Sequence, residues 1–395
     1  MSRSVILGGM RTPFGKLNGS LSSKSAVELG GLAIRCAMER SGVVPADVDH
    51  VVMGQVLQGG AGQIPARQAA FLAGLDKTVT SETVNRVCGS GMLAITTADL
   101  QLRAGDHEVV VAGGMESMSN APYLLRKART GYRMGDGVLE DMMVSDGLTC
   151  AVAGVHMGVH GGNVAAEEEV SREEQDAWAL RSHQRYFAAK ERGVYDEEIF
   201  PVEIKNRKGD AIVDRDEAPR RDTSAEALAG LKPVFDPNGT VTAGNAPGVN
   251  DGAAAVVLAS EAWAKERGMT PAATILAHGA AAWDVPYLAY TPELAARVAL
   301  KKAGLTVEDI DLVEINEAFA SVPIISARRL GVDPKKVNVN GGAIALGHPI
   351  GASGARVVIA LVNELRRRGG GLGLAAICSG GGQGDALVVE VPGGQ

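Results

Sequence analysis

The segment Gly42-Val43-Val44-Pro45-Ala46-Asp47-Val48-Asp49-His50-Val51 occurs a second time in this chain in closely related form. The second copy is Gly304-Leu305-Thr306-Val307-Glu308-Asp309-Ile310-Asp311-Leu312-Val313, which begins 262 residues later (304 minus 42). Each copy follows an amphipathic helical pattern, over residues 26–40 in the first and 293–302 in the second. A duplication of this kind indicates two copies of one structural unit.

A second pair of matching positions extends the repeat. Ser90-Gly91 and Ser353-Gly354 are 263 residues apart (353 minus 90), and each pair opens a long helical stretch. Each stretch leads to an apolar run that is typical of a buried strand, at 108–112 and at 373–377. Strands that alternate with helices favour largely parallel sheets with helices on both faces. The sequence therefore predicts an α/β fold of two pseudo-equivalent halves.

Length and composition limit the class of protein. The 395 residues, 46% hydrophobic and 22% charged, are typical of a globular chain of two or three domains. A net charge of −7 without a basic tract argues against nucleic-acid binding. No apolar run approaches the roughly 18 residues of a membrane span, and the N-terminus shows no targeting pattern. With four irregularly spaced cysteines, we expect a cytoplasmic protein without a membrane or nucleic-acid partner.

The segment between the two halves fits neither copy of the repeat. It begins with Met-rich and Arg-rich loops and contains one clear helix, which starts at Ser171 and stops at Gly193. Ser171-Arg172-Glu173-Glu174 has the pattern of a capping box. We interpret residues 119–249 as an inserted loop domain. The remaining chain then forms an N-terminal half, 1–118 with 250–269, and a C-terminal half, 270–395.

Cys88 is the first candidate for chemistry, within Asn85-Arg86-Val87-Cys88-Gly89-Ser90-Gly91. A thiol at the start of a helix meets unpaired backbone N–H groups and the helix dipole, which favour its thiolate. The flanking glycines let a substrate approach the backbone closely. The alternative is a buried, inert cysteine beside a tight turn.

Two glycine-framed clusters near the end of the chain supply possible partners for this thiol. His348 lies in Gly347-His348-Pro349, and a neutral histidine beside a cysteine commonly generates the nucleophile. Cys378 precedes Ser379 and three glycines, whose N–H groups form a nest for an oxyanion. Taken singly, His348 is also compatible with a structural turn, and Cys378 with a buried strand end. Together the three residues predict a two-thiol active site between the halves.

Asn316 follows an expected strand over 311–315, in Asn316-Glu317-Ala318-Phe319. It either caps the next helix or holds a water or the substrate at the same sheet edge. His156 and His160 have the spacing of a helical metal pair, but no third ligand is indicated, so we expect no metal. The glycine-rich segment over 341–354 matches neither a dinucleotide fingerprint nor a P-loop, so we expect no nucleotide cofactor.

With these motifs assembled, the chain resembles the thiolase family from end to end. The similarity rests on seven separated motifs in the family's order: 85–91, 239–245, 249–253, 316–319, 338–342, 347–349 and 378–382. The resemblance implies two βαβαβαββ halves in an α-β-α-β-α five-layer arrangement. It also implies that the insertion binds coenzyme A, and that its early part mediates assembly of a homotetramer.

The resemblance also implies roles for the candidate residues. Cys88 would attack a thioester and carry the acyl group, with His348 activating it. Cys378 would exchange the α-proton of a second acetyl-CoA, and the enolate oxygen would rest against His348 and a water held by Asn316. The backbone N–H groups of Cys88 and Gly380 would form the oxyanion hole. The positions implied for coenzyme A and acyl binding are Leu148, His156, Met157, Arg220, Leu231, Phe235, Ala243, Ala318 and Phe319.

The chain departs from the family's biosynthetic pattern at three places. Pro247 and Ala227 each stand where a serine often contacts coenzyme A. Leu288-Ala289-Tyr290-Thr291-Pro292 replaces a Met-Gly-x-Gly-Pro loop beside the acyl group. The expected activity is condensation of two acetyl-CoA to acetoacetyl-CoA and CoA, or thiolysis of a 3-ketoacyl-CoA, with CoA thioesters as substrates and no cofactor. A longer-chain 3-ketoacyl-CoA thiolase, a ketoacyl synthase and a catalytically silent subunit remain as alternatives.

Overall fold

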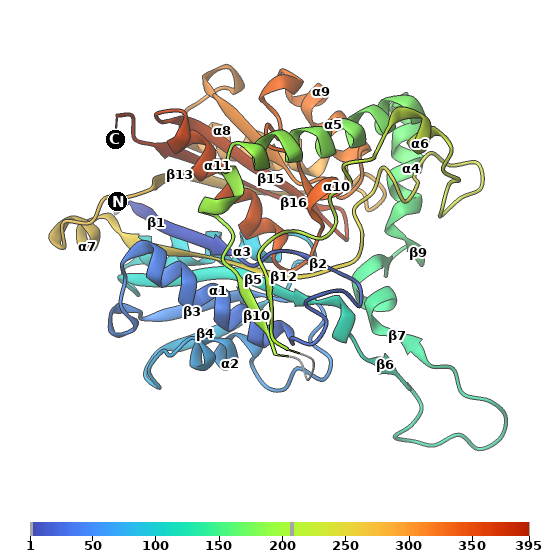
Figure 1. The fold of residues 1–395 in the computed structure, drawn as a ribbon, viewed down its shortest axis with the longest axis horizontal. Helices are drawn as coiled ribbons and strands as arrows, with labels where there is room; N and C mark the ends of the chain where they lie inside the picture. The colour runs from blue at the N-terminus through green and yellow to red at the C-terminus, as the bar shows by residue number, and fades with distance from the viewer. Residues whose placement is uncertain (1–2, 206–208, 395) are drawn as a thin grey trace.

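The computed structural model describes residues 3–205 and 209–394, and two related sets of strands organise it (Figure 1). In the N-terminal half the strand order is β1-β12-β5-β3-β4, and in the C-terminal half it is β13-β16-β15-β14. The first set comprises β1 (Ser4–Arg11), β3 (His50–Gly54), β4 (Thr80–Val84), β5 (Val109–Ser117) and β12 (Asn250–Ser260). The second comprises β13 (Ala273–Ala282), β14 (Leu312–Ile315), β15 (Gly371–Ser379) and β16 (Gln383–Val391).

The two halves repeat the same strand pairing, which confirms the predicted duplication. β3 is parallel to β4 and β5, and β14 is parallel to β15. Where the N-terminal half has β4, the C-terminal half has a single parallel bridge between Val313 and Val337. The halves meet through β1 and β13, which pair only at Val5 with Thr274 and at Ile6 with Ala273. This junction joins them into one ten-stranded sheet, with β2 (Gly15–Lys16) beside β12.

Helices form three layers around these strands. α3 (Ser90–Ala104) and α11 (Ser353–Arg367) pack against each other and against strands of both halves, so they form the central layer. α1 (Ala26–Ser41) and α2 (Pro65–Leu72) cover the outer face of the N-terminal half. α8 (Thr291–Ala303) and α9 (Ser321–Leu330) cover the opposite outer face (Figure 1). The layers therefore alternate as α-β-α-β-α, as predicted.

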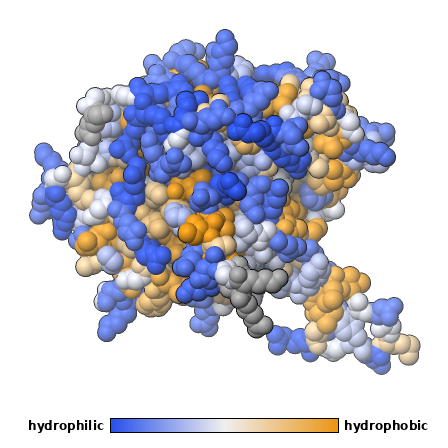
Figure 2. Space-filling view, viewed as in Figure 1, coloured by the Kyte–Doolittle hydropathy of each residue, from blue (hydrophilic) through white to orange (hydrophobic). Residues whose placement is uncertain are grey.

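The inserted segment leaves the sheet after β5 and returns at β12, which is the neighbour of β5 in the sheet. It contains short elements and two longer helices, α4 (Met157–Glu167) and α5 (Arg172–Glu191). Between β6 (Tyr123–Leu124) and β7 (Glu140–Asp141) the chain projects away from the body, and Figure 2 shows hydrophobic residues on this projection. The other elements of the insertion are η2 (Met118–Asn120), η3 (Met143–Leu148), β8 (Thr149–Cys150), β9 (Val155–His156), η4 (Val194–Glu197), β10 (Val202–Ile204), β11 (Ala211–Val213) and α6 (Ala225–Ala229).

The helix predicted from Ser171 forms, but only half of its capping box does. Ser171 Oγ accepts a hydrogen bond from Glu174 N at 3.1 Å. The Glu174 carboxylate does not accept a hydrogen bond from the Ser171 N–H, because it forms an ion pair with the Arg328 guanidinium on α9. A tertiary ion pair thus replaces the second local hydrogen bond. Gly193 follows the helix with a φ of 73°, the left-handed conformation that glycine adopts at helix ends.

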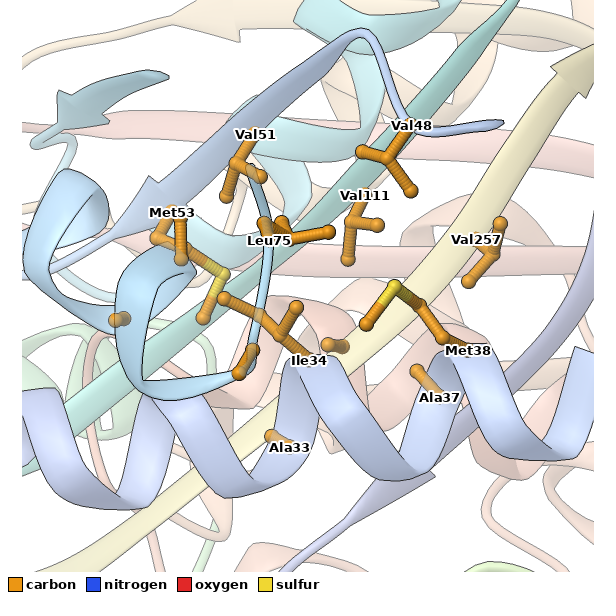
Figure 3. Packing of buried hydrophobic residues seen from close by; sticks show 14 of the residues in the cluster. Ala33, Ile34, Ala37, Met38, Val48, Val51, Met53, Leu75, Val111 and Val257 are labelled. Atoms are coloured by element: carbon orange, nitrogen blue, oxygen red, sulfur yellow. The ribbon is translucent and has the colours of Figure 1, made fainter. Parts of the chain in front are cut away.

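α1 shows how the outer layer is held. Its N-cap Ser25 and Glu28 form a complete capping box. Apolar residues on its inner face, including Ile34 and Met38, pack on Val111 and Val257 of the sheet (Figure 3). Ile34 is fully buried, so its replacement by alanine should cost about 2–5 kcal/mol. The layer therefore depends on apolar packing, with the cap fixing where the helix begins.

The remaining connections are short. They are η1 (Pro45–Asp47), α7 (Glu261–Glu266), η5 (Val307–Asp309), η6 (Pro334–Lys336) and α10 (Ala343–Leu346). Among the described residues, no helix combines the length and the apolar character needed to span a bilayer. The last of these elements, α10, leads directly to the loop that carries His348.

Candidate active site

A cavity of about 270 Å³ lies where the Cys88 and His348 loops meet the end of β15. It is lined by Cys88, His348, Cys378 and Gly380, which the sequence indicated as catalytic. It is also lined by seven residues that the family resemblance implied for coenzyme A and acyl binding: Leu148, His156, Met157, Phe235, Pro247, Ala318 and Phe319. The fold thus brings residues from both halves and from the insertion to one pocket, at the carboxyl ends of strands where α/β folds bind ligands.

A strained turn presents Cys88 to this cavity. Val87 has a φ of 46°, in the left-handed region that a β-branched residue rarely adopts. Its N–H donates to Asn85 Oδ1 at 2.9 Å, and its carbonyl accepts from Ser90 Oγ at 2.6 Å. Ser90 Oγ also accepts from the Arg86 N–H at 2.8 Å. These hydrogen bonds fix the conformation of the turn despite its strain. They hold Cys88 two residues before Ser90, the first residue of α3.

The surroundings of Cys88 act on the pKa of its thiol in opposite directions. Burial raises its pKa to about 12, while its own backbone N–H and that of Gly380 lower it. The loss of water around the sulfur outweighs the favourable backbone dipoles that the helix-start position indicates. The same two N–H groups converge on the sulfur, where an oxyanion would form after attack on a thioester.

The His348 loop is fixed from both sides. Asn250, the first residue of β12, accepts from the His348 N–H at 2.8 Å, and its amide donates to the Gly15 carbonyl at 2.9 Å. His348 Nδ1 lies 2.6 Å from Ser353 Oγ, which donates its own proton to the Pro349 carbonyl at 2.9 Å. Ser353 Oγ therefore accepts from Nδ1–H, which assigns the proton to Nδ1 and leaves Nε2 as the free base.

His348 is neutral at physiological pH. Burial, followed by the charge of Arg356, lowers its pKa to about 3. A resting pair of Cys88 thiolate and imidazolium is thus unfavourable in this site. Proton transfer from Cys88 to Nε2 should therefore accompany attack on the substrate and should not precede it.

Cys378 is the last residue but one of β15, and it is almost fully buried. Burial raises its pKa well above the usual value, and a negative charge on Cys88 raises it further. Two adjacent thiolates would repel each other in this enclosed space. Only one of the two sulfurs is therefore expected to be ionised at a time.

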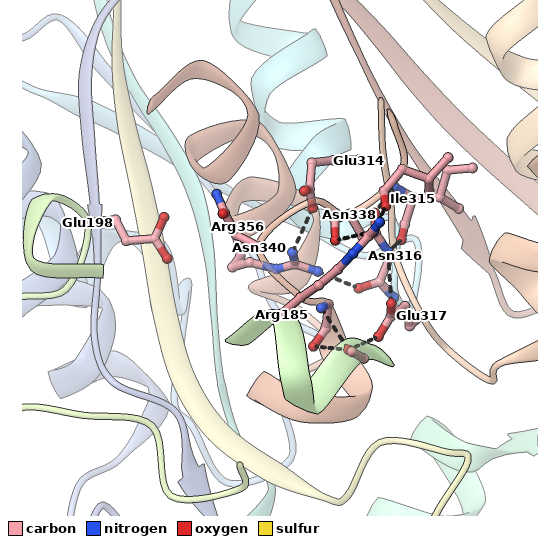
Figure 4. A network of polar contacts seen from close by, with 12 residues as sticks. Arg185, Glu198, Glu314, Ile315, Asn316, Glu317, Asn338, Asn340 and Arg356 are labelled. Atoms are coloured by element: carbon pink, nitrogen blue, oxygen red, sulfur yellow. Dashed lines mark hydrogen bonds and ion pairs between the residues drawn. The ribbon is translucent and has the colours of Figure 1, made fainter. Parts of the chain in front are cut away.

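Asn316 belongs to a buried polar network (Figure 4) and does not cap the next helix, which begins at Ser321 after the N-cap Ala320. Asn316 Nδ2 lies 3.5 Å from His348 Nε2, and Arg356 Nη2 donates to Asn316 Oδ1 at 3.2 Å. Arg356 Nη1 pairs with Glu314 Oε2 at 3.2 Å. Because Arg356 can only donate, it requires the Asn316 oxygen to face it and turns the amide nitrogen toward His348.

A second buried carboxylate, that of Glu116, joins the His348 loop to the segment that follows β3. Glu116 accepts from the N–H groups of Val56, Leu57 and Gly351 at 3.0–3.1 Å. Burial raises its pKa to about 7, and these N–H groups lower it. Since Gly351 follows His348 and Glu116 lies on β5, this side chain ties the His348 loop to the N-terminal half.

Four residues indicated by the sequence lie outside the cavity lining. Asn316 is completely buried behind His348. Arg220 and Ala243 are exposed on the insertion, and the Arg220 backbone N–H donates to His183 Nδ1 at 3.2 Å. Leu231 is partly buried and packs against the C-terminal core. His156, in contrast, stacks on Phe235 with ring centroids 4.1 Å apart and forms part of the cavity wall.

Sequence reasoning did not identify Ser353, Asn250, Arg356 or Glu116 as parts of the site. Ser353 carried a usable signal, because it is the repeat equivalent of Ser90. Each hydroxyl donates to a carbonyl in the loop before it, which carries Cys88 in one half and His348 in the other. Arg356 and Glu116 carried none, since their partners are distant in sequence.

Comparison with known proteins agrees with this geometry. Residues 4–262 match the family model described as "Thiolase, N-terminal domain", and residues 269–391 match "Thiolase, C-terminal domain". The chain is 49% identical over 391 residues to the acetyl-CoA acetyltransferase of Escherichia coli K12, covering 99% of each chain. It is 50% identical over 391 residues to that of Cupriavidus necator, covering 99% of this chain and 100% of the relative.

A solved structure is also closely similar. The crystal structure of the Bacillus anthracis acetyl-CoA acetyltransferase superposes with a TM-score of 0.96 at 43% identity, covering 99% of each chain. The family models together span nearly the whole sequence, and the relatives match over their full length. The chain therefore belongs to the thiolase family.

Proposed function

We propose that the chain is an acetyl-CoA C-acetyltransferase, which reversibly condenses two acetyl-CoA to acetoacetyl-CoA and CoA. The observation that carries the proposal is the convergence of Cys88, His348 and Cys378 on one cavity, with the Gly380 N–H at the Cys88 sulfur. Relatives named acetyl-CoA acetyltransferase, at about 50% identity over full length, support the choice of substrate.

The first half-reaction acylates Cys88. Its sulfur attacks the acetyl-CoA carbonyl carbon as its proton moves to His348 Nε2, and the resulting oxyanion rests on the N–H groups of Cys88 and Gly380. The carbon–sulfur bond to CoA then breaks. The departing CoA thiolate takes the proton from His348 Nε2, so that free CoA leaves and His348 is neutral again.

The second half-reaction forms the carbon–carbon bond. Acylation removes the possibility of a charge on Cys88, so it also removes the repulsion that opposes ionisation of Cys378. Cys378 passes its proton to His348 Nε2 and takes the α-proton of a second acetyl-CoA, and the enolate oxygen then faces His348 Nε2–H. The α-carbon attacks acetyl-Cys88, and the released Cys88 sulfur recovers its proton from His348. All protons are then back in place.

The shape of the cavity favours a short acyl chain. Its volume of about 270 Å³ lies just below the usual range for ligand pockets, and it must hold the end of pantetheine as well. Leu288, from the loop that departs from the family's biosynthetic pattern, is buried and lines it. Pro247 also lines it and offers no hydroxyl.

Substrate comparison tests the proposal. Purified protein is incubated with CoA and either acetoacetyl-CoA or 3-ketooctanoyl-CoA, and loss of each 3-ketoacyl-CoA is followed. The proposal predicts much faster thiolysis of acetoacetyl-CoA. Faster cleavage of the longer substrate would instead identify a degradative 3-ketoacyl-CoA thiolase. The presence of Cys378 argues against a decarboxylating ketoacyl synthase, because such an enzyme uses no second cysteine. The presence of Cys88, His348 and Cys378 together argues against a catalytically silent subunit.

We further propose that the enzyme is a cytoplasmic homotetramer that needs no metal or other cofactor. The projection between β6 and β7 exposes Met134, Val138 and Leu139, and an apolar surface of this kind favours contact with another subunit. All four cysteines are free, which suits a reducing compartment. Light scattering of the wild-type protein and of a variant lacking residues 126–138 tests the assembly; a tetramer in both would contradict this role for the projection.

A further inference from the structure

A second cavity, of about 280 Å³, lies at the opposite end of the central helices from the active site. It is lined by residues of β1 and β12, by the last residues of α1, by the segment before β13 and by residues 358–366 of α11. α11 begins at Ser353, beside His348, and Arg366 lies 13 residues later (366 minus 353), about 20 Å along the helix. This cavity therefore belongs to a different surface of the molecule.

The cavity arises where the two halves separate. β1 pairs with β13 only at Val5 and Ile6, and its register against β12 shifts at Leu7. At Gly9 a Cβ atom would lie 2.7 Å from Val256 Cγ1 and 2.9 Å from Ile359 Cγ1. Only glycine therefore lets the β1 backbone approach these two side chains so closely. Beyond this point β1 has no partner on the β13 side within the cavity, and the ends of α1 and α11 enclose the space.

Three unpartnered polar side chains line it. Arg40 and Arg366 are exposed at its rim, and neither guanidinium has a hydrogen-bond or ion-pair partner within the described residues. Asn363 is 8% exposed, and its Nδ2 is buried without a partner. Asn363 and Arg366 are three residues apart on α11, so they share one face of the helix. A buried amide without a partner costs free energy unless a ligand or water satisfies it.

The charge around this cavity is positive. An adjoining depression of about 440 Å³ shares Arg40 and Arg366 with it. That depression adds Arg367 and Glu197, whose charges pair with each other at 3.5 Å. Two uncompensated guanidinium groups therefore remain at the shared rim, in a protein whose net charge is −7. Such a local reversal of charge attracts small anions.

We propose that this cavity binds a small polyanion, with phosphate or carboxylate groups held between Arg40 and Arg366 and hydrogen-bonded to Asn363 Nδ2. Guanidinium groups recognise both kinds of group with paired, charge-assisted hydrogen bonds. The cavity volume admits a small metabolite and not a polymer. The site does not depend on the acetyl-transfer chemistry, since it shares no residue with the active-site cavity.

Calorimetry on the full chain tests the site, with inorganic pyrophosphate and citrate as the phosphate and carboxylate probes. Each unpartnered arginine should contribute roughly tenfold in affinity, so Arg40→Gln with Arg366→Gln should weaken binding about a hundredfold. Both side chains are exposed and unpaired, so the double variant should fold normally. The control carries Arg35→Gln and Arg267→Gln, which remove two exposed charges elsewhere and should leave binding unchanged.

Hydrogen exchange locates the bound probe. Binding should slow exchange in the last turns of α1 and α11 in the wild type and not in the double variant. Pyrophosphate could also occupy the coenzyme A cleft, so Arg220→Gln is measured in parallel and should retain binding at the proposed site. The proposal is overturned if neither probe binds at millimolar concentration, if the double variant binds like the wild type, or if only Arg220→Gln abolishes binding.

Discussion

Replacing Arg356 tests whether the buried network positions Asn316 or only supports the fold. Arg356 is 1% exposed and holds Glu314 and Asn316 through separate guanidinium nitrogens. Arg356→Met would leave the Glu314 carboxylate buried without a cation, which should lower the free energy of unfolding by about 3–5 kcal/mol. Burial raises the pKa of Glu314 and the charge of Arg356 lowers it, so the loss of Arg356 should raise this pKa further. This variant alone cannot separate the two roles.

A second substitution separates them. Adding Glu314→Leu removes the unpaired charge, and replacement of a buried ion pair by apolar side chains is often neutral, so stability should largely return. Asn316 would still lack the charged donor that orients it, a bond worth about 1.5–3 kcal/mol. Turnover of the double variant should therefore remain roughly tenfold to hundredfold below wild type.

The assay combines chemical unfolding with acetoacetyl-CoA thiolysis. Asn316→Ala is added to the wild type and to the Arg356→Met, Glu314→Leu background. If Arg356 acts through Asn316, this substitution should reduce turnover far less in the second background. A double variant with wild-type stability and wild-type turnover would refute a positioning role for Arg356.

Three further predictions follow from the site. Ser353→Ala removes the acceptor of His348 Nδ1–H, so turnover should fall about tenfold or more in steady-state kinetics; an unchanged rate would contradict the tautomer assignment. The pKa of His348 is lowered to about 3, so the unfolded state binds a proton below about pH 6.5 while the folded state does not, and stability falls as pH falls. His348→Asn should therefore lose about 2 kcal/mol less than wild type between pH 7 and pH 5 in urea unfolding, whereas equal losses would mean that His348 titrates normally. Mild oxidant should inactivate the enzyme reversibly and acyl-CoA should protect it; peptide mapping then distinguishes a Cys88–Cys378 disulfide from oxidation of Cys88 alone.

The sequence alone predicted the architecture because the evidence for it is local. The duplicated Gly42–Val51 segment and the paired helix starts at Ser90 and Ser353 require only pattern comparison, and both halves fold as that pattern indicates. The glycine-framed motifs likewise identified Cys88, His348 and Cys378, which the fold places at one cavity. Their catalytic roles remain predictions.

What sequence reasoning missed depends on burial and on long-range partners. The pKa of Cys88 is controlled by loss of solvent, which the helix-start motif does not report. Glu174 left its capping box for Arg328, 154 residues away in the chain. Arg356 similarly meets Glu314 and Asn316 only because α11 packs against β14. Such interactions are decided by packing, so no local pattern contains them.

The central claim is that Cys88 carries the acyl group while Cys378 moves the α-proton. One paired measurement tests this claim most directly. Cys378→Ala and Cys88→Ser are each incubated with acetyl-CoA in deuterium oxide, and protein mass and α-deuterium content are recorded together. The account predicts that Cys378→Ala acquires an acetyl group on Cys88 but loses α-proton exchange by roughly 10²–10⁴-fold. It also predicts that Cys88→Ser forms no adduct at that position. Full exchange by Cys378→Ala, or a wild-type yield of adduct on Cys88→Ser, would contradict it.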